Sequence, residues 1–192
     1  MAANTEEIQS KLTEILRQHL PDIVITVEDS GANSERPLIT LIDPSFEGLY
    51  PEQRFRVILH ALPKEFLNQH LENAEWRELA PGEDLSSIEY PDAGLIEDIS
   101  PDVLAVVGGS EFYKRLDSAF LTGAKCSGKF VLSKELLRDC AFDESEIDDI
   151  FHVFMSKGGF CDCEILYNVA DQSELRSRYW KAQSERHATG QY

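Results

Sequence analysis

The order of secondary-structure signals in residues 5–83 constrains the fold of this chain more than any other feature of the sequence. Apolar residues recur at helical intervals through residues 8–20, and Pro21 ends that run, which predicts an amphipathic helix. Two runs rich in β-branched residues follow at 23–27 and 38–42, with turn residues between them. These runs predict two antiparallel strands after the helix.

The next segment adds two helices and a third strand. Pro51 lies in the first turn of a helix, and Pro63 interrupts that helix, so residues 64–71 are expected to form a second, short helix. Residues 74–79 are expected to form the third strand. The predicted order is therefore α-β-β-α-α-β. The apolar stripe of the helix that begins at Pro51 consists of Phe55, Ile58, Leu59 and Leu62.

A change of composition suggests a domain boundary. Residues 84–102 are acidic, contain Pro91 and Pro101, and show little periodicity, which is typical of a linker or a docked irregular segment. We therefore expect one domain at 1–83 and a second at 103–192.

The second domain is expected to contain both strands and helices. The apolar run 103–107 and the segment 160–169 predict strands. Asp143 and Glu146 form a capping box at the start of a helix, which Gly158-Gly159 ends. Further helices are expected over residues 110–121 and 133–142. These signals predict a small α+β domain.

The charge of the chain disfavours some classes of partner. The net charge is −17, and residues 1–100 carry 7 Lys/Arg against 20 Asp/Glu. Such a field repels nucleic acid and anionic lipid. No apolar run approaches the roughly 20 residues that span a bilayer, and the first residues lack the order of a secretory signal. We therefore expect a cytoplasmic protein that binds neither nucleic acid nor membrane.

Several motifs in the first domain resemble a known family. Residues 25–31 resemble that family's Val-x-Asp-x-Ser-Gly entry to the first loop. Phe46-Glu-Gly followed by Arg54-x-Arg56 resembles its Phe-Glu-Gly and Arg-His-Arg-x-Val signature, and His70 resembles its late histidine. On these residues, and on Ala80-Pro-Gly-Glu near its end, the domain resembles the BolA family, which implies a KH-like α+β fold.

The resemblance also implies a partner and a cofactor. BolA-like proteins are associated with monothiol glutaredoxins, and some share a bridging [2Fe–2S] cluster with them. In that arrangement His70 would be one iron ligand, but residues 29–36, where a second ligand would lie, contain neither His nor Cys. Arg54 and Arg56 could contact the partner together with His70, or could hold the loop 46–48 by hydrogen bonds.

The four cysteines all lie in the second half, at Cys126, Cys140, Cys161 and Cys163. In a chain without a secretory signal, metal ligands or free thiols are expected more than disulfides. On a strand, Cys161 and Cys163 share one face, and with Cys126 nearby they would suit Zn²⁺. Cys140 or His152 could complete the site. Burial as small apolar side chains, which the pattern favours, and redox chemistry remain open.

The segment around the last two cysteines carries a second resemblance. Residues 151–169 resemble an uncharacterised bacterial domain with the motif Gly-Gly-(Phe/Tyr)-Cys-Asp-Cys-Glu, where Cys126-Ser-Gly128 stands in place of a frequent Cys-Asp-His. That resemblance implies no activity. Asp162 and Glu164 could form an acid–base pair, although bonds to neighbouring backbone are favoured.

These observations favour a non-enzymatic interaction or regulatory protein with a BolA-like docking domain and a second domain that a metal could stabilise. The alternative is a metal or iron–sulfur binding protein that acts with a monothiol glutaredoxin. A cysteine-based enzyme is the least favoured class.

Overall fold

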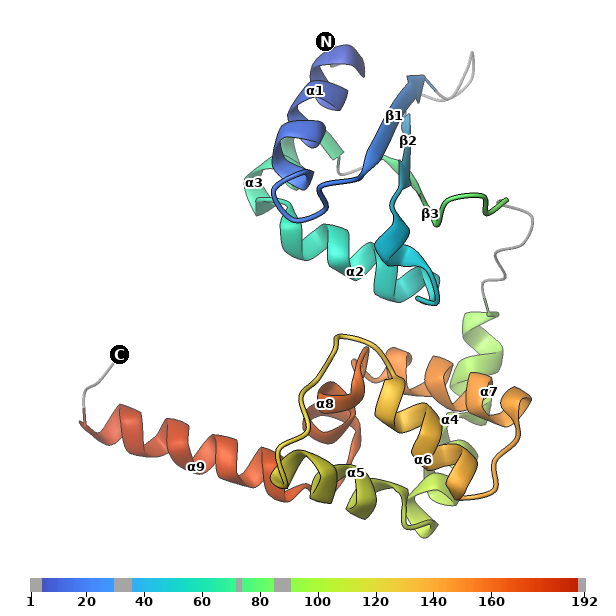
Figure 1. Ribbon diagram of the computed structural model, residues 1–192, viewed down its shortest axis with the longest axis vertical. Helices are drawn as coiled ribbons and strands as arrows, with labels where there is room; N and C mark the ends of the chain where they lie inside the picture. Colours follow the sequence, from blue (N-terminus) through green and yellow to red (C-terminus); the bar gives the residue numbers. More distant parts are fainter. Residues whose placement is uncertain (1–4, 30–35, 72–73, 85–90, 190–192) are drawn as a thin grey trace. The chain divides into compact units, whose positions relative to one another are not determined.

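The computed structural model describes residues 5–29, 36–71, 74–84 and 91–189. The chain divides at residue 90 into two compact units (Figure 1). The first unit contains a small sheet and helices, and the second is helical throughout the residues that are described.

The first unit follows the order that its sequence predicts. Helix α1 precedes two strands, two helices follow, and a third strand ends the unit. A turn of 3₁₀ helix lies between β2 and α2, and a π-helical turn continues α3. The bounds are α1 Thr5–Leu16, β1 Val24–Asp29, β2 Pro37–Ile42, η1 Pro44–Phe46, α2 Pro51–Ala61, α3 Lys64–Phe66, η2 Leu67–Leu71 and β3 Glu75–Leu79.

The sheet has the order β1-β2-β3, with β1 antiparallel and β3 parallel to β2. Val27 lies opposite Ile39, and Ile25 opposite Leu41, so these four side chains share the face that packs against α1. Leu12 of α1 is fully buried in the same cluster. Complete burial of such a side chain contributes about 1.5–3 kcal/mol, so the packing of α1 on this face is a substantial part of the unit's hydrophobic stabilisation.

The loop between β2 and α2 explains the Phe-Glu-Gly motif. Asp43 Oδ1 accepts a hydrogen bond from the Ser45 N–H at 2.8 Å, which holds the turn at the end of β2. Phe46 is fully buried in the core cluster. Gly48 has a φ of +69°, a conformation that favours glycine. The motif is therefore an anchor and a turn that direct the chain into α2.

The apolar stripe expected on α2 is only partly buried. Ile58 and Leu62 lie in the core, whereas Phe55 and Leu59 are 37% and 38% exposed. The buried side of α2 also includes Arg54, which makes polar contacts there. The spacing of apolar residues along the helix had predicted an apolar buried side. Phe55 and Leu59 therefore form an apolar patch on the surface of this unit.

The second unit is an assembly of helices. The prediction of an α+β domain is therefore wrong for its described residues. Four longer helices pack around the core, whereas the last helix has no buried residue in its described part and extends away from them (Figure 1). A short helical segment precedes that last helix. The bounds are α4 Ala93–Gly109, α5 Phe112–Leu121, α6 Val131–Asp139, α7 Glu144–Ser156, α8 Asp162–Glu164, η4 Ile165–Val169 and α9 Glu174–Thr189.

The run 103–107 is helical rather than a strand because it continues a helix that starts earlier. Asp92 caps α4, with its Oδ1 accepting hydrogen bonds from the N–H groups of Gly94 and Leu95. The helix runs through Pro101, and Val107 is the fully buried residue of the apolar run. A short apolar run fits a strand and a helix equally well, so periodicity alone did not decide. The second half of segment 84–102 is therefore helical, and residues 85–90 lie outside the described part.

Helix α7 follows its sequence signals closely. The capping box is present, since Asp143 Oδ1 accepts from the Glu146 N–H and Glu146 Oε2 accepts from the Asp143 N–H. Phe154 stacks on Phe112 of α5 with ring centroids 5.8 Å apart, and Phe151 stacks on Phe130 at 4.3 Å. These aromatic pairs join three segments into one core.

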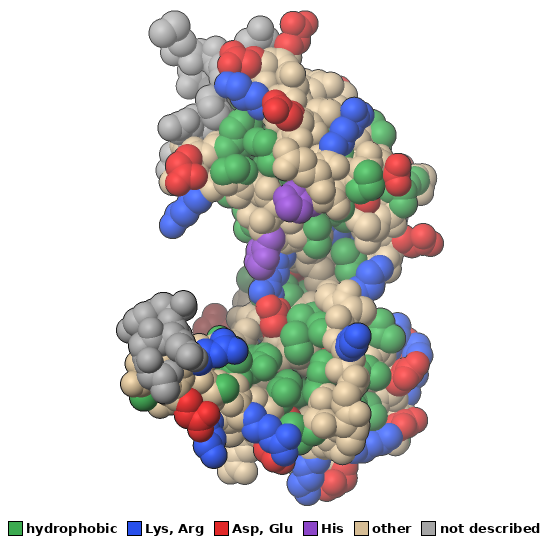
Figure 2. Space-filling view, turned by 60° about the vertical axis from the view of Figure 1, so that its left-hand side comes forward, with side chains coloured by type: hydrophobic (Ala, Val, Ile, Leu, Met, Phe, Trp, Pro, Cys, Tyr) green, Lys and Arg blue, Asp and Glu red, His purple; other side chains and the backbone are tan. Residues whose placement is uncertain are grey.

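Within the described ranges, no helix combines the length and the apolar composition that a bilayer crossing requires. On the face drawn in Figure 2, each unit carries charged side chains of both signs, and hydrophobic side chains reach the surface among these charged ones.

Candidate metal site

The site begins at the turn that ends α7. Gly158 has a φ of +85°, which favours glycine. Gly159 is needed for close packing, because a Cβ there would come within 2.8 Å of Val169 Cγ2 and 3.3 Å of the Phe154 carbonyl oxygen. The two glycines therefore let the chain reverse and pack closely against η4.

Residues 162–169 are helical, although the sequence suggested a strand over 160–169. Cys161 is extended, with φ −158°, and lies at the N-cap of α8, which continues directly into η4. Glu164 Oε2 accepts a hydrogen bond from the Phe160 N–H at 3.1 Å, which ties the first turn to the residue before the cap. This local bond favours a helical start that side-chain alternation does not reveal.

Asp162 is 1% exposed and caps a different helix. Its Oδ1 accepts from the Ser133 N–H at 2.9 Å, and its Oδ2 accepts from the Leu132 N–H at 3.1 Å. Both donors belong to the first turn of α6, whose own N-cap residue makes no side-chain bond. A carboxylate is stabilising at this end of a helix. Asp162 and Glu164 thus bond backbone groups, as the sequence analysis favoured over an acid–base pair.

Three cysteine sulfurs converge beside this segment. Cys161 Sγ and Cys163 Sγ lie 3.5 Å apart, and Cys126 Sγ joins them so that all three atoms are within 4.8 Å of one another. Cys126 comes from the loop between α5 and α6, which runs beside α8 in Figure 1. Cys161 and Cys163 therefore point to the same side, as expected. They do so because an extended residue, Cys161, is followed by a helical turn, and not because the segment is a strand.

The spacing of the sulfurs fits a thiophilic metal ion. In a tetrahedral zinc site with Zn–S bonds of about 2.3 Å, neighbouring sulfurs lie roughly 3.8 Å apart. Here one pair of sulfurs is 3.5 Å apart and the other pairs are no more than 4.8 Å apart, which is close to that value. Small side-chain adjustments would place all three sulfurs on one ion.

A backbone N–H group points at one of the sulfurs. The Gly128 N–H donates to Cys126 Sγ at 3.4 Å. Such a donor stabilises a metal-bound thiolate. Without an ion, the hydrogen bond with Cys163 and then burial raise the pKa of Cys161 far above its usual range. Cys161 alone is therefore a protonated thiol, and a cation would be needed to hold it as a thiolate.

Two further residues considered as ligands lie elsewhere. The ligand group found among the described residues contains neither Cys140 nor His152. Cys140 is the C-cap residue of α6. His152 lies in α7 with its Nε2 3.8 Å from Asp148 Oδ2. The structure thus brings together three of the five residues considered for zinc.

Arg54, expected to hold a loop or contact a partner, is buried at 4% exposure. Its Nε donates to the Leu49 carbonyl at 2.9 Å, one terminal nitrogen donates to the Glu78 carbonyl at 2.9 Å, and the guanidinium forms a two-bond ion pair with Glu83. This ion pair lowers the pKa of Glu83. Arg54 therefore has a structural role and joins the loop after Phe46 to the end of β3.

The other residues named in the first unit differ in exposure. Arg56 is partly exposed, with its Nε 3.5 Å from His60 Nε2 one turn along α2. The backbone of His70 lies in η2, but its side chain is outside the described part of the structure. The expectation that His70 binds iron or a partner thus remains a prediction.

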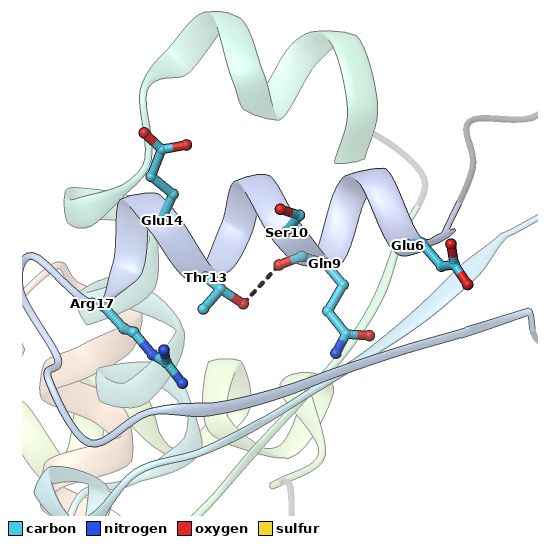
Figure 3. Close-up of a pocket in the computed structure, with 6 residues that line it drawn as sticks. All are labelled: Glu6, Gln9, Ser10, Thr13, Glu14 and Arg17. Carbon is cyan, nitrogen blue, oxygen red and sulfur yellow. Dashed lines mark hydrogen bonds between the residues drawn. The ribbon is translucent and has the colours of Figure 1, made fainter.

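A shallow depression follows one side of α1 (Figure 3). Thr13 donates to the Gln9 carbonyl, and the Gln9 side chain points toward β1, where its Oε1 accepts from the Val27 N–H. The second of these bonds attaches the helix to the strand. The lining is polar and comes from α1 and the residue that follows it, Glu6, Gln9, Ser10, Thr13, Glu14 and Arg17.

The comparisons with known proteins each cover part of the chain. Residues 112–168 match a family model described as "Protein of unknown function (DUF2695)", a stretch that contains Cys126, Cys161 and Cys163. Among solved structures, BolA1 from Arabidopsis thaliana matches with 22% sequence identity and a TM-score of 0.33 over 40% of this chain and 95% of that one. A search of curated proteins returns no match.

Proposed function

We propose that this protein is a non-enzymatic interaction or regulatory protein in which Cys126, Cys161 and Cys163 bind one thiophilic metal ion, zinc in the first instance. The first unit docks a protein partner, as its BolA-like motifs imply. The convergence of the three sulfurs within 4.8 Å carries the proposal.

The metal would act on the second unit as a cross-link. Cys126 lies in the loop before α6, and Cys161 and Cys163 lie at the start of α8. Asp162, between them, already bonds the first turn of α6. An ion bound to all three sulfurs would hold the middle of this loop against α8, and Asp162 already holds the end where α6 begins. Zinc sites of this kind contribute directly to folding free energy.

Metal content of the purified full chain tests this proposal. Protein prepared without chelator should carry one zinc per chain, and replacement of Cys161 and Cys163 by Ser should remove it. Cys140→Ser is the matched control, because that thiol lies outside the cluster and should retain the ion. A folded, metal-free wild-type protein, or equal loss in both variants, would refute the assignment.

The docking role rests on the sequence resemblance and on one surface. The apolar patch of Phe55 and Leu59 lies on α2, with partly exposed Arg56 beside it on the same helix. Apolar anchors next to a guanidinium are typical of protein interfaces. A monothiol glutaredoxin is the partner that the family resemblance implies.

The alternative function, iron–sulfur binding together with that glutaredoxin, is separable by experiment. A cluster would absorb in the visible range and bring iron and sulfide, whereas zinc would do neither. A pull-down with a monothiol glutaredoxin, with and without iron and sulfide, tests the partner. Phe55→Glu should abolish capture and Val106→Glu, an exposed residue of the second unit, should not. Absence of capture in either condition would remove this partner.

A further inference from the structure

The sulfur cluster has an exposed side. Cys161 is buried at 9%, but Cys126 and Cys163 are both partly exposed. A metal bound by the three sulfurs would therefore lie near the surface of the second unit rather than in its core. Among the described residues, three side chains lie close enough together to bind this metal ion. Zinc sites with three protein ligands hold their fourth position for an exchangeable ligand, whereas closed structural sites use four.

The loop around Cys126 leaves room on that side. A Cβ built on Gly128 would meet no atom within 4 Å. Gly128 is itself exposed, and its N–H donates to Cys126 Sγ at 3.4 Å, so the loop next to this sulfur is open to solvent. A small ligand could approach the ion past residue 128 without displacing a side chain of the described structure.

The chemistry of the cluster favours sulfur in the fourth position. Three thiolates outweigh the two positive charges of Zn²⁺, which weakens its ability to acidify bound water compared with a site of neutral histidines. A thiophilic ion with sulfur ligands binds a further thiolate well. The charge of the loop adds a preference, because the exposed Lys125 directly precedes Cys126 in a chain whose net charge is −17. An anionic group on the ligand would be attracted to this lysine.

We propose that the metal at Cys126, Cys161 and Cys163 takes a small, carboxylate-bearing thiol as its fourth ligand. This inference rests on the proposed function. On binding, the thiol releases its proton to solvent while its sulfur forms the bond to the metal, and water leaves the fourth position. No oxidation or reduction takes place. The second unit is then a metal-dependent thiol-binding module rather than a purely structural one.

The test uses the full chain loaded with Co²⁺, which reports sulfur coordination by its absorption spectrum. The probe is 3-mercaptopropionate, and 3-(methylthio)propionate is the control with the same carboxylate and no thiol. The proposal predicts a saturable rise in sulfur-to-cobalt charge-transfer absorption with the first compound, release of one proton per site, and no change with the second.

A charge variant tests the selectivity. Lys125→Glu should weaken the binding of 3-mercaptopropionate several-fold more than that of 2-mercaptoethanol, which binds through the same sulfur but has no carboxylate. Cobalt that binds in a three-sulfur site but does not respond to any thiol would overturn the inference and leave the proposed function intact. A spectrum already saturated by a fourth ligand of the chain would do the same. Failure to bind cobalt at the cysteines would overturn both.

Discussion

Glu78 of β3 is a buried acid that should destabilise the first unit as pH rises. Its side chain is 4% exposed, and its Oε1 has no hydrogen-bond partner within the described part of the chain. Burial raises the pKa of Glu78 from 4.5 to about 7, against the opposing effects of a backbone hydrogen bond and of the Arg54 charge. Glu78→Gln replaces the titrating group with a neutral side chain of similar shape.

The sign and size follow from the two pKa values. Below pH 4.5 the carboxyl is protonated in both the folded and the unfolded chain, so it costs nothing. Between pH 4.5 and about 7 the unfolded chain loses the proton first, and stability falls. Above that window the difference is constant, with an upper limit of about 3 kcal/mol because each pKa unit is worth 1.36 kcal/mol. Glu78→Gln should therefore be nearly neutral at pH 4.5 and stabilising by about 2–3 kcal/mol at pH 8.

Urea denaturation at a series of pH values measures this effect. The chain has two tryptophans, so a Trp180→Phe background leaves Trp76 of β3 as the fluorescent reporter of the first unit. Glu75→Gln is the matched control, because it removes an exposed carboxyl from the same strand and should show no such pH dependence. An equal effect of Glu78→Gln at pH 4.5 and pH 8 would refute the assignment of a raised pKa.

Three further substitutions have defined outcomes. Arg54→Ala should cost about 3–5 kcal/mol in the same assay because it strands buried acceptors, and Arg56→Ala should cost almost nothing. Gly159→Ala should cost about 1–3 kcal/mol by overpacking against Val169, whereas Gly108→Ala, with open space at its Cβ, should be neutral or slightly stabilising in thermal denaturation. Gly128→His should tighten zinc binding at least tenfold in a competition titration by adding a ligand beside Cys126, and Gly128→Ala, which has the same positive φ without a ligand, should not. Equal effects within any pair would contradict the corresponding reasoning.

The first unit was predictable because its signals are local and agree with one another. The proline at position 51 opens α2, Pro63 ends it, and the β-branched runs form β1 and β2. The burial of Arg54 was not predictable, because its partner Glu83 lies 29 residues away in the sequence. Periodicity describes one helix at a time and does not show what lies opposite it.

The second unit shows the same limit more strongly. The capping box of α7 lies within four residues and was read correctly. The helical state of 162–169 depends on Gly159 packing against Val169 and on Asp162 capping α6, both of which are tertiary contacts. The convergence of Cys161 and Cys163 could be anticipated from their spacing. The hydrogen bond from the Gly128 N–H to Cys126 could not be anticipated, because the sequence shows only that a glycine lies two residues after the cysteine.

Zinc-edge X-ray absorption spectroscopy of the full chain tests the central claim most directly, because it counts the sulfur atoms on the ion. The account predicts three protein sulfurs at about 2.3 Å in the wild-type protein, together with one lighter ligand in thiol-free buffer. It predicts no such shell after Cys161 and Cys163 are replaced by Ser. A zinc ion surrounded only by nitrogen and oxygen, or an unchanged spectrum in the double variant, would contradict it.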